Sequence, residues 1–542
     1  MLGCDAMVKC LEAEGVRAVF GYPGVAIAPF YNSMLQTDEI ESVLVRTEQN
    51  AGHAANGYSR VTGAVGVCAV TSGPGATNLI TGIATAYADS IPMVCITGQV
   101  ESTLLGSDVF QEADITGAVE SFVKYSYLVK DVKDIPRVFK EAFHIANTGR
   151  RGPVLIDVPI DIQNAKLDKF SYPEEVVLRT YKPTVKGNVV QIKKLLKELS
   201  KAKKPLICAG GGVILSGAQT ELADFAAKYR VPVVHTMMGI GVLPSDHEMY
   251  YGMVGNNGKG YANAAMNDAD LLVIIGARVA DRAVNQPDLI TENKVMVHID
   301  VDPAEIGKNA ASTIPIVGDV KTILMQIEEE AKDVIVPPHK QWLETLDEYK
   351  VKLVKKRHPD QRYVDPAVFI DKLSRAMKDD GIYIADVGQN QIWSCANYVM
   401  KKGRFLTSGG MGTMGYSIPA GMGVKRALGD DAQVVAVCGD GAFQMSFMEF
   451  ATMKQHAINI KVIVLKNNYL GMVRQYQHFK YNDNYSVVDL TGSPDLEKIA
   501  LAYDIPFVRV QNMENIDKVI ADFLADDSLA LMECIIDPMD LV

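Results

Sequence analysis

The chain lacks the long apolar runs of membrane proteins and export signals. No apolar stretch reaches the roughly 18 residues that a membrane-spanning helix requires. The N-terminal segment MVKCLEAEGV follows an amphipathic pattern, and no apolar core follows a basic start as it does in secretory signals. These absences predict a protein of the cytoplasm that makes no contact with a membrane.

Cysteine pairs with metal-site spacing are also missing. None of the eight cysteines stands in a CxxC motif, and several lie within apolar runs. This distribution predicts reduced cysteines that pack in hydrophobic cores. Basic blocks are equally absent, because 54 Lys and Arg residues are spread along the chain against 65 Asp and Glu residues, for a net charge of −11. Nucleic acid is therefore not expected as a partner.

What the chain does contain is a regular alternation of apolar, strand-like runs with helical stretches. The runs lie at residues 17–23, 66–72, 92–98, 152–159, 204–212, 231–237, 270–278, 295–302, 381–388, 433–441 and 460–468. This alternation is typical of parallel sheets with helices on both faces. Two stretches rich in charge and proline, 166–187 and 335–362, are predicted linkers. The predicted fold is therefore α/β, with doubly wound parallel-sheet domains at 1–165, 188–334 and 363–542.

The segment CGDGAFQM places a carboxylate at the end of a buried run. Asp440 lies between two glycines, and the next apolar run ends at Asn467. Because a strand, a helix and a second parallel strand bring both carboxyl ends to one sheet edge, Asp440 and Asn467 are expected to converge. Two oxygen donors of this kind suit Mg²⁺ that bridges to a diphosphate. The alternative is that Asp440 belongs to a turn and Asn467 caps a helix, but the pairing at neighbouring strand ends favours the metal site.

A second carboxylate follows a strand in the first predicted domain. The segment ESVLVRTEQNAGHAANGYSR predicts a strand that ends at Val45 and a helix that begins near Glu48. Taken alone, Glu48 at this position stabilises the positive N-terminus of the helix.

These features resemble one enzyme family over nearly the whole chain. The GDG motif with Asn467 is similar to the diphosphate-anchoring motif of thiamine diphosphate enzymes. The segments FGYPG, TSGPGATN, DVFQEADITG, GRRGPVLIDVP, DVGQNQIW, SGGMGTMGYSIPAG and NNYLGMVRQYQ resemble the large, catalytic subunit of acetohydroxyacid synthase (acetolactate synthase). The resemblance implies three domains: pyrimidine-binding, central FAD-binding-like and diphosphate-binding.

The resemblance also implies a reaction and partners. The family decarboxylates pyruvate and joins the resulting hydroxyethyl carbanion to a second 2-ketoacid, which gives acetolactate or acetohydroxybutyrate for branched-chain amino acid biosynthesis. Its active sites lie at the interface of a homodimer or dimer of dimers. A regulatory small subunit is a further expected partner.

The resemblance assigns the thiamine diphosphate site to the third domain. Mg²⁺ is expected on Asp440, Asn467 and the carbonyl group of Tyr469. Met414 resembles the side chain that holds the cofactor in a bent form. The other residues expected around the cofactor are Val387, Gly388, Gln389, Asn390, Gly412, Gly441, Ala442, Met445, Gly471 and Met472.

Residues near the reacting groups are implied as well. Glu48 is expected to cross to a partner chain, where its carboxyl group activates the aminopyrimidine of the cofactor. Phe110 and Gln111 resemble an active-site wall, although they would be unremarkable as surface loop residues. Gly24 ends the FGYPG motif, and Val25 follows it where the family has a second glycine; both are expected catalytic-site residues. Val473 and Tyr476 are expected to contact the acceptor ketoacid, with Tyr476 in place of a more usual Trp and a weaker preference for 2-ketobutyrate.

The central domain resembles a flavin site. The residues that carry this resemblance are Arg150, Gly210, Gly211, Gly212, Thr236, Met237, Met253, Gly276, Ala277, Arg278, Arg282, Asp300 and Asp319. Two positions depart from the family pattern, because Ala280 replaces an Asp and Val254 replaces a His. FAD is therefore an expected cofactor without redox chemistry, with arginines that pair with its diphosphate or remain solvated.

Three rival functions remain open on the sequence. A flavin-free fermentative acetolactate synthase and a simple 2-ketoacid decarboxylase would share Glu48 and the GDG motif. The decarboxylases usually carry paired active-site histidines, which the GYP segment does not offer. A nucleotide-binding scaffold without activity is the third, and the presence of Glu48, Asp440 and Asn467 argues against it.

Overall fold

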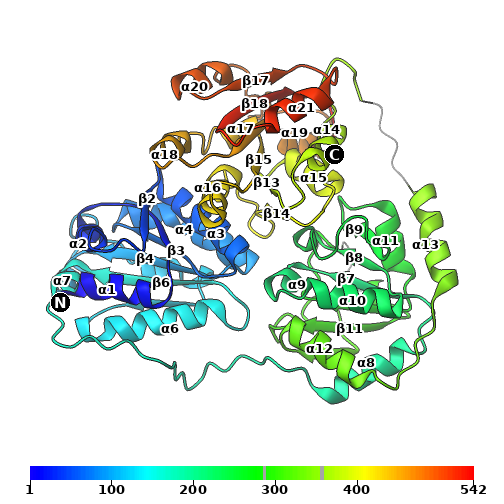
Figure 1. Cartoon of the computed structure of the whole chain (residues 1–542), viewed down its shortest axis with the longest axis horizontal. Helices are drawn as coiled ribbons and strands as arrows, with labels where there is room; N and C mark the ends of the chain where they lie inside the picture. Colours follow the sequence, from blue (N-terminus) through cyan, green and yellow to red (C-terminus); the bar gives the residue numbers. More distant parts are fainter. Residues whose placement is uncertain (285–288, 354–358) are drawn as a thin grey trace.

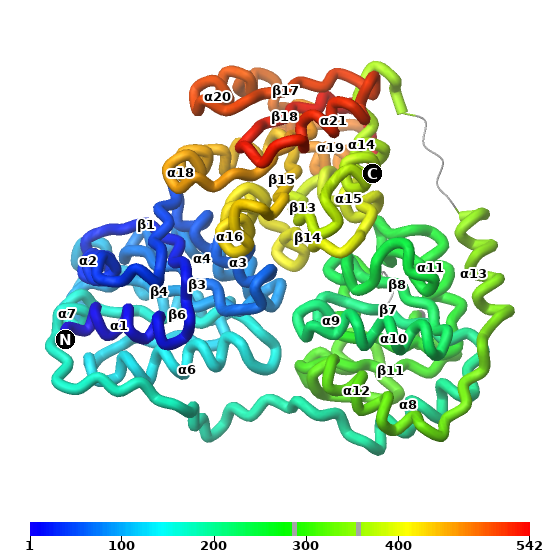
Figure 2. The backbone as a smooth tube through the Cα atoms, viewed as in Figure 1, coloured from blue at the N-terminus to red at the C-terminus, as the bar shows by residue number. Residues whose placement is uncertain are grey.

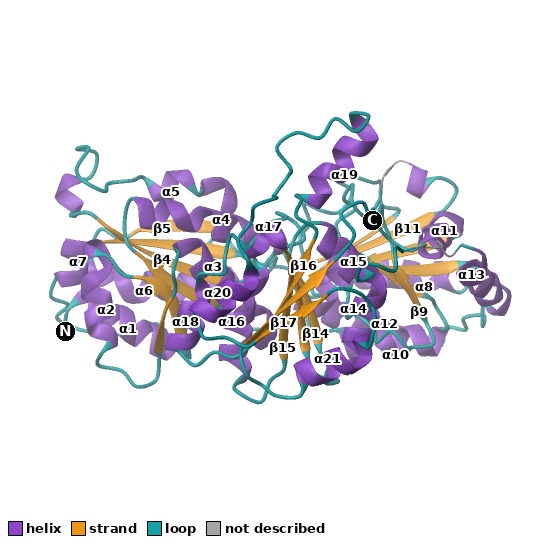
Figure 3. Cartoon of the chain, turned by 90° about the horizontal axis from the view of Figure 1, so that it is seen from above, coloured by secondary structure: helices purple, strands orange, loops and turns teal. Residues whose placement is uncertain are grey.

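The computed structural model describes residues 1–284, 289–353 and 359–542, which form three six-stranded sheets (Figure 1). The strands of each sheet pair in parallel. Helices cover the sheets, as the view in Figure 3 shows. The predicted class of three parallel-sheet α/β domains is confirmed. We refer to the first, central and third domains after these sheets, and the residue boundaries between them stay predictions.

The first sheet has the order β2-β1-β3-β4-β6-β5. Its strands are β1 (Ala18–Tyr22), β2 (Glu41–Leu44), β3 (Gly66–Val70), β4 (Met93–Gln99), β5 (Tyr125–Leu128) and β6 (Pro153–Pro159). Its helices are α1 (Gly3–Ala13), α2 (Ala28–Met34), α3 (Glu48–Thr62), α4 (Pro74–Asp89), α5 (Ile115–Ala118), α6 (Ile135–Asn147) and α7 (Ile160–Asn164). The order reverses direction between β1 and β3, so the carboxyl ends of these strands frame a crevice.

The third sheet repeats this topology, with the order β14-β13-β15-β16-β18-β17. Its strands are β13 (Ile382–Ala385), β14 (Arg404–Thr407), β15 (Val434–Gly439), β16 (Lys461–Lys466), β17 (Phe507–Val510) and β18 (Ala530–Ile535). Its helices are α14 (Pro366–Ala376), α15 (Gln389–Asn397), α16 (Ser417–Leu428), α17 (Asp440–Phe443), α18 (Glu449–Gln455), α19 (Gly471–Lys480), α20 (Leu496–Ala502) and α21 (Ile516–Leu524). The equivalent crevice lies between β13 and β15.

The central sheet has a different order, β12-β11-β10-β7-β8-β9. Its strands are β7 (Pro205–Ala209), β8 (Val233–His235), β9 (Tyr250–Met253), β10 (Leu271–Ile275), β11 (Val295–Asp300) and β12 (Ile314–Val317). Its helices are α8 (Val189–Leu199), α9 (Gly211–Leu215), α10 (Gln219–Tyr229), α11 (Gly260–Asp268), α12 (Val320–Glu330) and α13 (Lys340–Lys352). This order is the one common in dinucleotide-binding domains, whose ligands bind where the winding reverses, here between β7 and β10.

The two predicted linkers differ in structure. Residues 166–187 carry no helix or strand, and Figure 2 shows them as a long connection from the first domain to the central domain. The second predicted linker contains α13, whose Trp342 and Leu346 are buried in the core of the central domain. The Trp342 indole N–H donates to the Pro205 carbonyl at 3.0 Å. The expectation of a bare linker at 335–362 is therefore wrong for residues 340–352.

The first and third domains share one hydrophobic core. A single cluster of buried side chains contains Ala51 and Ile83 of the first domain with Ile418 and Phe443 of the third. Helices α3 and α16 cross at the centre of this junction, where a Cβ atom on Gly423 would collide with the Ala54 carbonyl. The central domain has its own core cluster, which lies within residues 192–346. Two further clusters complete the first and third domains, and the one in the third domain also includes Ile240 and Met253 of the central domain.

All eight cysteines are buried and unpaired, as the sequence predicted. Within the described ranges, no helix is both long and apolar enough to span a bilayer.

Candidate active site

A pocket opens at the crevice between β13 and β15, which we call the third-domain pocket. Asp440 follows β15 and Asn467 follows β16, and both side chains line the pocket although 26 residues lie between them in the sequence. The predicted convergence of the two residues is thus observed. The complete lining comprises Val387, Gly388, Gln389, Asn390, Trp393, Met414, Gly439, Asp440, Gly441, Ala442, Leu465, Asn467, Tyr469, Leu470, Gly471, Met472, Val473 and Ile536.

Asp440 and Asn467 present oxygen atoms into this pocket under tight backbone control. The backbone amide of Asn468 donates to Asp440 Oδ2 at 2.7 Å, and that of Tyr469 donates to Asn467 Oδ1 at 3.0 Å. Burial raises the pKa of Asp440 to about 6. A buried carboxylate beside an amide oxygen is a donor set that a hard divalent cation suits, because the cation would offset the cost of burying the charge. The geometry therefore fits Mg²⁺.

Gln389 lies at the floor of the same pocket. Asn467 Nδ2 donates to Gln389 Oε1 at 3.3 Å. The close approach depends on Gly471, because a Cβ atom there would collide with the Gln389 side chain and lie 2.9 Å from Asn467 Nδ2. Gly388, at φ +127°, adopts a conformation that L side chains rarely reach. Small residues thus keep the pocket open around its polar groups.

Asp386 organises the pocket without lining it, and the sequence prediction did not identify it. The fully buried carboxylate accepts hydrogen bonds from the backbone amides of Val387 at 2.8 Å, Gly415 at 2.9 Å and Ser417 at 2.8 Å. Burial raises its pKa. Asp386 therefore fixes the turn that presents Met414 to the pocket. Its position directly after an apolar run, like that of Asp440, was the signal available in the sequence.

Three predicted residues lie near the pocket without lining it. Gly412 has φ +70° in the turn before Met414, and the Met445 side chain is exposed beside Gly415. Tyr476 on α19 is 55% exposed and packs edge-on against Tyr481, with ring centroids 5.9 Å apart. Their roles stay predictions.

The C-terminal residues 538–542 cover one side of the pocket. The Arg474 guanidinium donates to the Pro538 carbonyl at 2.6 Å, and the Gln389 amide donates to the Asp540 carbonyl at 3.0 Å. Gln475 exchanges two hydrogen bonds with the backbone of Val542, at 2.9 and 3.2 Å. The tail thereby contacts both α19 and a residue of the pocket floor.

The predicted catalytic residues of the first domain gather at the crevice between β1 and β3. Glu48 begins α3, and its Oε2 accepts a hydrogen bond from Asn78 at 3.1 Å. Gly75 lies beside it, because a Cβ atom there would be 3.3 Å from Glu48 Oε1. A Cβ atom on Gly24 would lie 2.6 Å from Thr71, so the FGYPG turn packs directly on the end of β3. Glu48 and the FGYPG turn thus lie close together, on either side of Thr71 and Gly75, and their catalytic roles stay predictions.

Apolar side chains beside this group face solvent. Val25 is 78% exposed and Phe110 is 86% exposed. Gln111 adopts a left-handed conformation with φ +60°, and its carbonyl would lie 2.9 Å from a Cβ atom on Gly73. The residues that line the third-domain pocket all fall between 387 and 536, so Glu48 is not one of them.

A larger pocket of about 470 Å³ lies where the three domains meet, and we call it the interdomain pocket. It opens at the reversal point between β7 and β10 of the central sheet. The predicted flavin residues that line it are Arg150, Gly211, Gly212, Thr236, Met237, Met253, Gly276, Ala277, Arg278, Arg282, Asp300 and Asp319. Gly210 lies just behind, where a Cβ atom would collide with the Gly276 carbonyl. The dimensions and the glycine cradle fit a dinucleotide.

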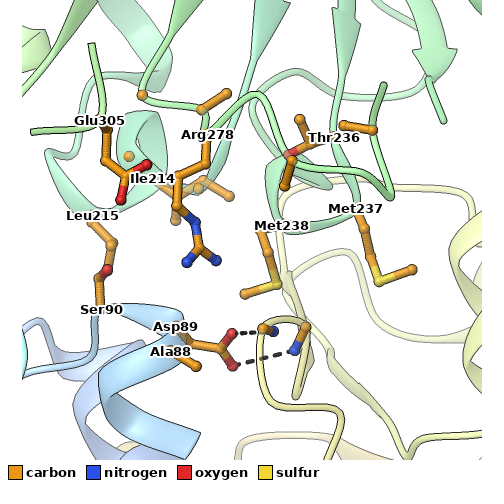
Figure 4. Close-up of a pocket in the computed structure, with 18 of the residues that line it drawn as sticks. Ala88, Asp89, Ser90, Ile214, Leu215, Thr236, Met237, Met238, Arg278 and Glu305 are labelled. Atoms are coloured by element: carbon orange, nitrogen blue, oxygen red, sulfur yellow. Dashed lines mark hydrogen bonds between the residues drawn. The ribbon is translucent and has the colours of Figure 1, made fainter. Parts of the chain in front are cut away.

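The charges of the interdomain pocket are partly paired. Arg150 contacts Asp302 at 3.2 Å and Glu305 at 2.9 Å. Figure 4 shows the Arg278 side chain extending into the pocket toward Asp89. Burial raises the pKa of Asp300 to about 6. Val254 and Ala280, the two departures from the family pattern, also line the pocket.

Comparison with known proteins agrees with this architecture. Residues 1–118 match the thiamine pyrophosphate enzyme N-terminal TPP binding domain, residues 192–327 the central domain, and residues 386–534 the C-terminal TPP binding domain. The chain is 41% identical to the probable acetolactate synthase large subunit of Methanocaldococcus jannaschii, over 100% of this chain and 93% of that protein.

Two bacterial relatives show the same degree of similarity. Identity is 40% to the acetolactate synthase isozyme 3 large subunit of Escherichia coli, over 96% of this chain and 92% of that protein. It is 42% to the acetolactate synthase large subunit of Corynebacterium glutamicum, over 95% of this chain and 83% of that protein. The chain therefore belongs to the acetolactate synthase large subunit family of thiamine pyrophosphate enzymes.

Proposed function

We propose that the chain is the catalytic subunit of a thiamine diphosphate-dependent acetolactate synthase. It decarboxylates pyruvate and condenses the remaining two-carbon unit with a second 2-ketoacid, to give acetolactate or acetohydroxybutyrate. The observation that carries the proposal is the convergence of Asp440 and Asn467 in a pocket at the reversal point of the third sheet. Similarity to acetolactate synthase large subunits over nearly the full chain supports the reaction.

Mg²⁺ would be held by the Asp440 carboxylate, the Asn467 amide oxygen and the Tyr469 carbonyl group, with the diphosphate supplying further ligands. Backbone amides of the turn at 387–390 and of Gly441 and Ala442 line the same pocket and are placed to donate to phosphate oxygens. Met414, fixed through Asp386, would support the cofactor from the side of its rings.

The bound cofactor supplies a carbon nucleophile for the keto group of pyruvate and accepts the negative charge left by loss of CO₂. Glu48 would hold a proton at the pyrimidine nitrogen, and Asn78 orients its carboxyl group through the 3.1 Å hydrogen bond. Phe110 and Gln111, with Gly24 and Val25, would form the wall that excludes water from the reacting carbon.

The active site requires a second copy of the chain. Glu48 does not line the third-domain pocket of its own chain, and the Val25 and Phe110 side chains of the first domain are exposed. Apolar side chains of this size at a catalytic edge favour burial against a partner. We therefore place each active site between Glu48 of one protomer and Asp440 of the other, in a homodimer or dimer of dimers.

FAD is proposed as the ligand of the interdomain pocket. Arg278 and Arg282 are placed to pair with its diphosphate, while Asp300, at the end of β11, is placed to accept from a ribose hydroxyl. The reaction transfers no net electrons, so the flavin would have a structural role. Flavin fluorescence titration tests this assignment separately from activity.

Further partners follow from the same family. The relatives are named large subunits, which supports a regulatory small subunit as the partner of this chain. We also propose that the enzyme acts in the cytoplasm, in branched-chain amino acid biosynthesis.

Product analysis after incubation with pyruvate, thiamine diphosphate, Mg²⁺ and FAD tests the central proposal. Acetolactate is the expected product. Acetaldehyde would indicate a simple decarboxylase, and no product would indicate a scaffold without activity.

Val473 and Tyr476 are the proposed contacts of the acceptor ketoacid. A Tyr ring leaves more room and more polarity than a Trp ring, and one methylene group is worth only about 1–3 kcal/mol in such a pocket. We expect Tyr476→Trp to raise the share of acetohydroxybutyrate when pyruvate and 2-ketobutyrate compete. An unchanged product ratio would exclude Tyr476 from the acceptor site.

A further inference from the structure

Residues 407–416 run directly from one pocket to the other. Thr407, Gly409 and Gly410 line the interdomain pocket, and Met414 lines the third-domain pocket. We call these residues the bridging segment. It begins at the last residue of β14 and ends at the residue before α16. Only three residues, 411 to 413, separate Gly410 at the interdomain pocket from Met414 at the third-domain pocket.

Asp89 holds the first half of the bridging segment. The backbone amide of Gly410 donates to Asp89 Oδ1 at 2.7 Å, and that of Gly409 donates to Oδ2 at 3.3 Å (Figure 4). The carboxylate is buried and forms a 2.6 Å ion pair with Arg60. Because Asp89 is the last residue of α4, it ties the first domain to a segment of the third domain.

Two glycines leave the segment no room to shift independently. A Cβ atom on Gly410 would lie 2.7 Å from the Ala88 carbonyl, and one on Gly409 would collide with the Met238 side chain. Met238 belongs to the central domain and lines the interdomain pocket (Figure 4). A ligand in that pocket therefore meets a surface to which Asp89, Met238 and the bridging segment all contribute.

The second half of the segment is held as firmly. Thr413 is hydrogen-bonded through its amide to Ser408 Oγ at 3.0 Å and through its hydroxyl to Thr85 at 2.8 Å. Asp386 then fixes Gly415 at 2.9 Å. Hydrogen bonds therefore fix the segment at both ends and in the middle, and the two pockets share it as one structural element.

We propose that Asp89 is a positioning residue that couples the two pockets. Its carboxylate sets the bridging segment in the arrangement that both pockets need, so a ligand in either pocket strengthens binding in the other. The inference rests on the proposed function, which assigns FAD to the interdomain pocket and thiamine diphosphate to the third-domain pocket. A carboxylate that only joined two domains would stabilise the fold without linking the two affinities.

The test measures FAD affinity by quenching of flavin fluorescence, without and with saturating thiamine diphosphate and Mg²⁺. In the wild-type protein we expect FAD to bind more tightly with the second cofactor present, on the order of fivefold or more. Asp89→Asn replaces one acceptor oxygen by an NH2 group, which cannot accept, so either the Gly409 or the Gly410 N–H loses its acceptor. We expect this variant to bind FAD with nearly the same affinity in both conditions.

Asp281→Asn is the matched control. Asp281 lines the same pocket and is hydrogen-bonded to the Arg282 amide at 2.9 Å, away from the bridging segment. The variant also removes one negative charge from the pocket, so its FAD affinity can differ from that of the wild type. The fold-change in FAD affinity caused by thiamine diphosphate should persist. Equal fold-changes in Asp89→Asn and Asp281→Asn would overturn the proposal, as would a wild-type fold-change of one.

Asp89→Asn leaves Arg60 buried without its counter-charge, so the thermal unfolding of this variant must be compared with that of the wild type. Thr85→Val tests the same coupling without removing a charge. Thr85→Val removes the hydrogen bond to Thr413, together with the local bond from the Thr85 hydroxyl to the Thr81 carbonyl within α4, and should lower the fold-change partly. An undiminished fold-change in a folded Thr85→Val protein would count against coupling through the segment. Absence of flavin binding in the wild type would overturn the proposed FAD site. Flavin binding that thiamine diphosphate does not strengthen would overturn only the coupling.

Discussion

At the scale of single residues, three buried carboxylates show how partners decide what a charge does. Asp386 accepts hydrogen bonds from backbone amides and fixes a turn. Asp440 also accepts from a backbone amide but borders a pocket, so its charge is available to a cation. Asp157 accepts from the side chains of Thr97 at 2.7 Å and Gln99 at 3.0 Å. These surroundings predict different consequences of removing each charge.

Asp440→Ala removes the carboxylate proposed to bind Mg²⁺. We expect thiamine diphosphate affinity to fall by more than the roughly 10–100-fold that loss of an outer-shell partner costs at metal sites. Calorimetric titration with thiamine diphosphate in the presence of Mg²⁺ measures the change. Asp431→Ala, at an exposed carboxylate just before β15, is the control and should bind normally. Retained affinity in Asp440→Ala would mean that the cofactor binds elsewhere.

Asp157 predicts a pH dependence of stability. Burial raises its pKa from 3.8 to about 7. Between these values the folded protein holds a proton that the unfolded chain releases, so the free energy of unfolding should fall as pH rises from about 4 to about 7. Asp157→Asn should flatten this part of the profile, as measured by urea unfolding at several pH values. A profile with the same slope in the variant would show that Asp157 ionises normally.

At the scale of secondary-structure elements, the crossing of α3 and α16 depends on glycine. A Cβ atom on Gly423 would collide with the Ala54 carbonyl, which is backbone and cannot rotate away. A Cβ atom on Gly421 of the same helix would instead lie 2.9 Å from the tip of the Ile460 side chain, which can move. The two positions therefore make a matched pair.

Gly423→Ala is expected to lower the free energy of unfolding by about 1–3 kcal/mol, because overpacking costs more than the helix gains from alanine. Gly421→Ala should be neutral or stabilising, since alanine improves helix propensity by up to about 1 kcal/mol. Thermal or urea unfolding of both variants measures these two changes in the free energy of unfolding. Equal effects would mean that the helices can separate at little cost.

The apolar runs predicted most of the sheets but not their edges. The expected runs coincide with β1, β3, β4, β6, β7, β8, β10, β11, β13, β15 and β16. The runs missed β5, β9, β12, β14 and β17, all at sheet edges, and the inner strand β18. An edge strand is covered on fewer sides and needs less apolar sequence, as the half-exposed Tyr125–Leu128 shows. Pattern alone is therefore weakest where a strand has one neighbour.

The site was predictable where one motif carries it. Asp440 and Asn467 follow consecutive strands, so topology alone brings them together. Asp89 and Gly410 lie in different domains, and no local sequence pattern predicts the hydrogen bond between them. The packing of α13 was also not predicted, because most of its residues are charged or polar although Trp342 and Leu346 are buried in the central core. Long-range contacts of this kind require the folded structure.

At the scale of the whole molecule, the separation of Glu48 from the third-domain pocket predicts complementation between chains. Glu48→Gln and Asp440→Ala should each be inactive alone. If each active site combines Glu48 of one protomer with Asp440 of the other, a mixed dimer restores one site. Random reassortment of equal amounts should recover about a quarter of wild-type activity.

Acetolactate formation is measured after the two variants are unfolded and refolded together, with each variant refolded alone as the control. Recovery of activity only in the mixture supports sites shared between chains. An inactive mixture that contains mixed dimers would place both residues in one chain's site.

The core shared by α3 and α16 also bears on how the protein is made. The two helices are separated by roughly 350 residues, and synthesis at about 5–20 residues per second makes the first wait on the order of half a minute for the second. Throughout that interval α4, β1 and β3 already pack against α3, but the part of its surface that α16 will cover has no partner. The central domain, whose core lies within residues 192–346, can close as soon as it leaves the ribosome. The first domain is therefore expected to expose this part of α3 until the third domain has been made, so the domain synthesised first is among the last to be completed.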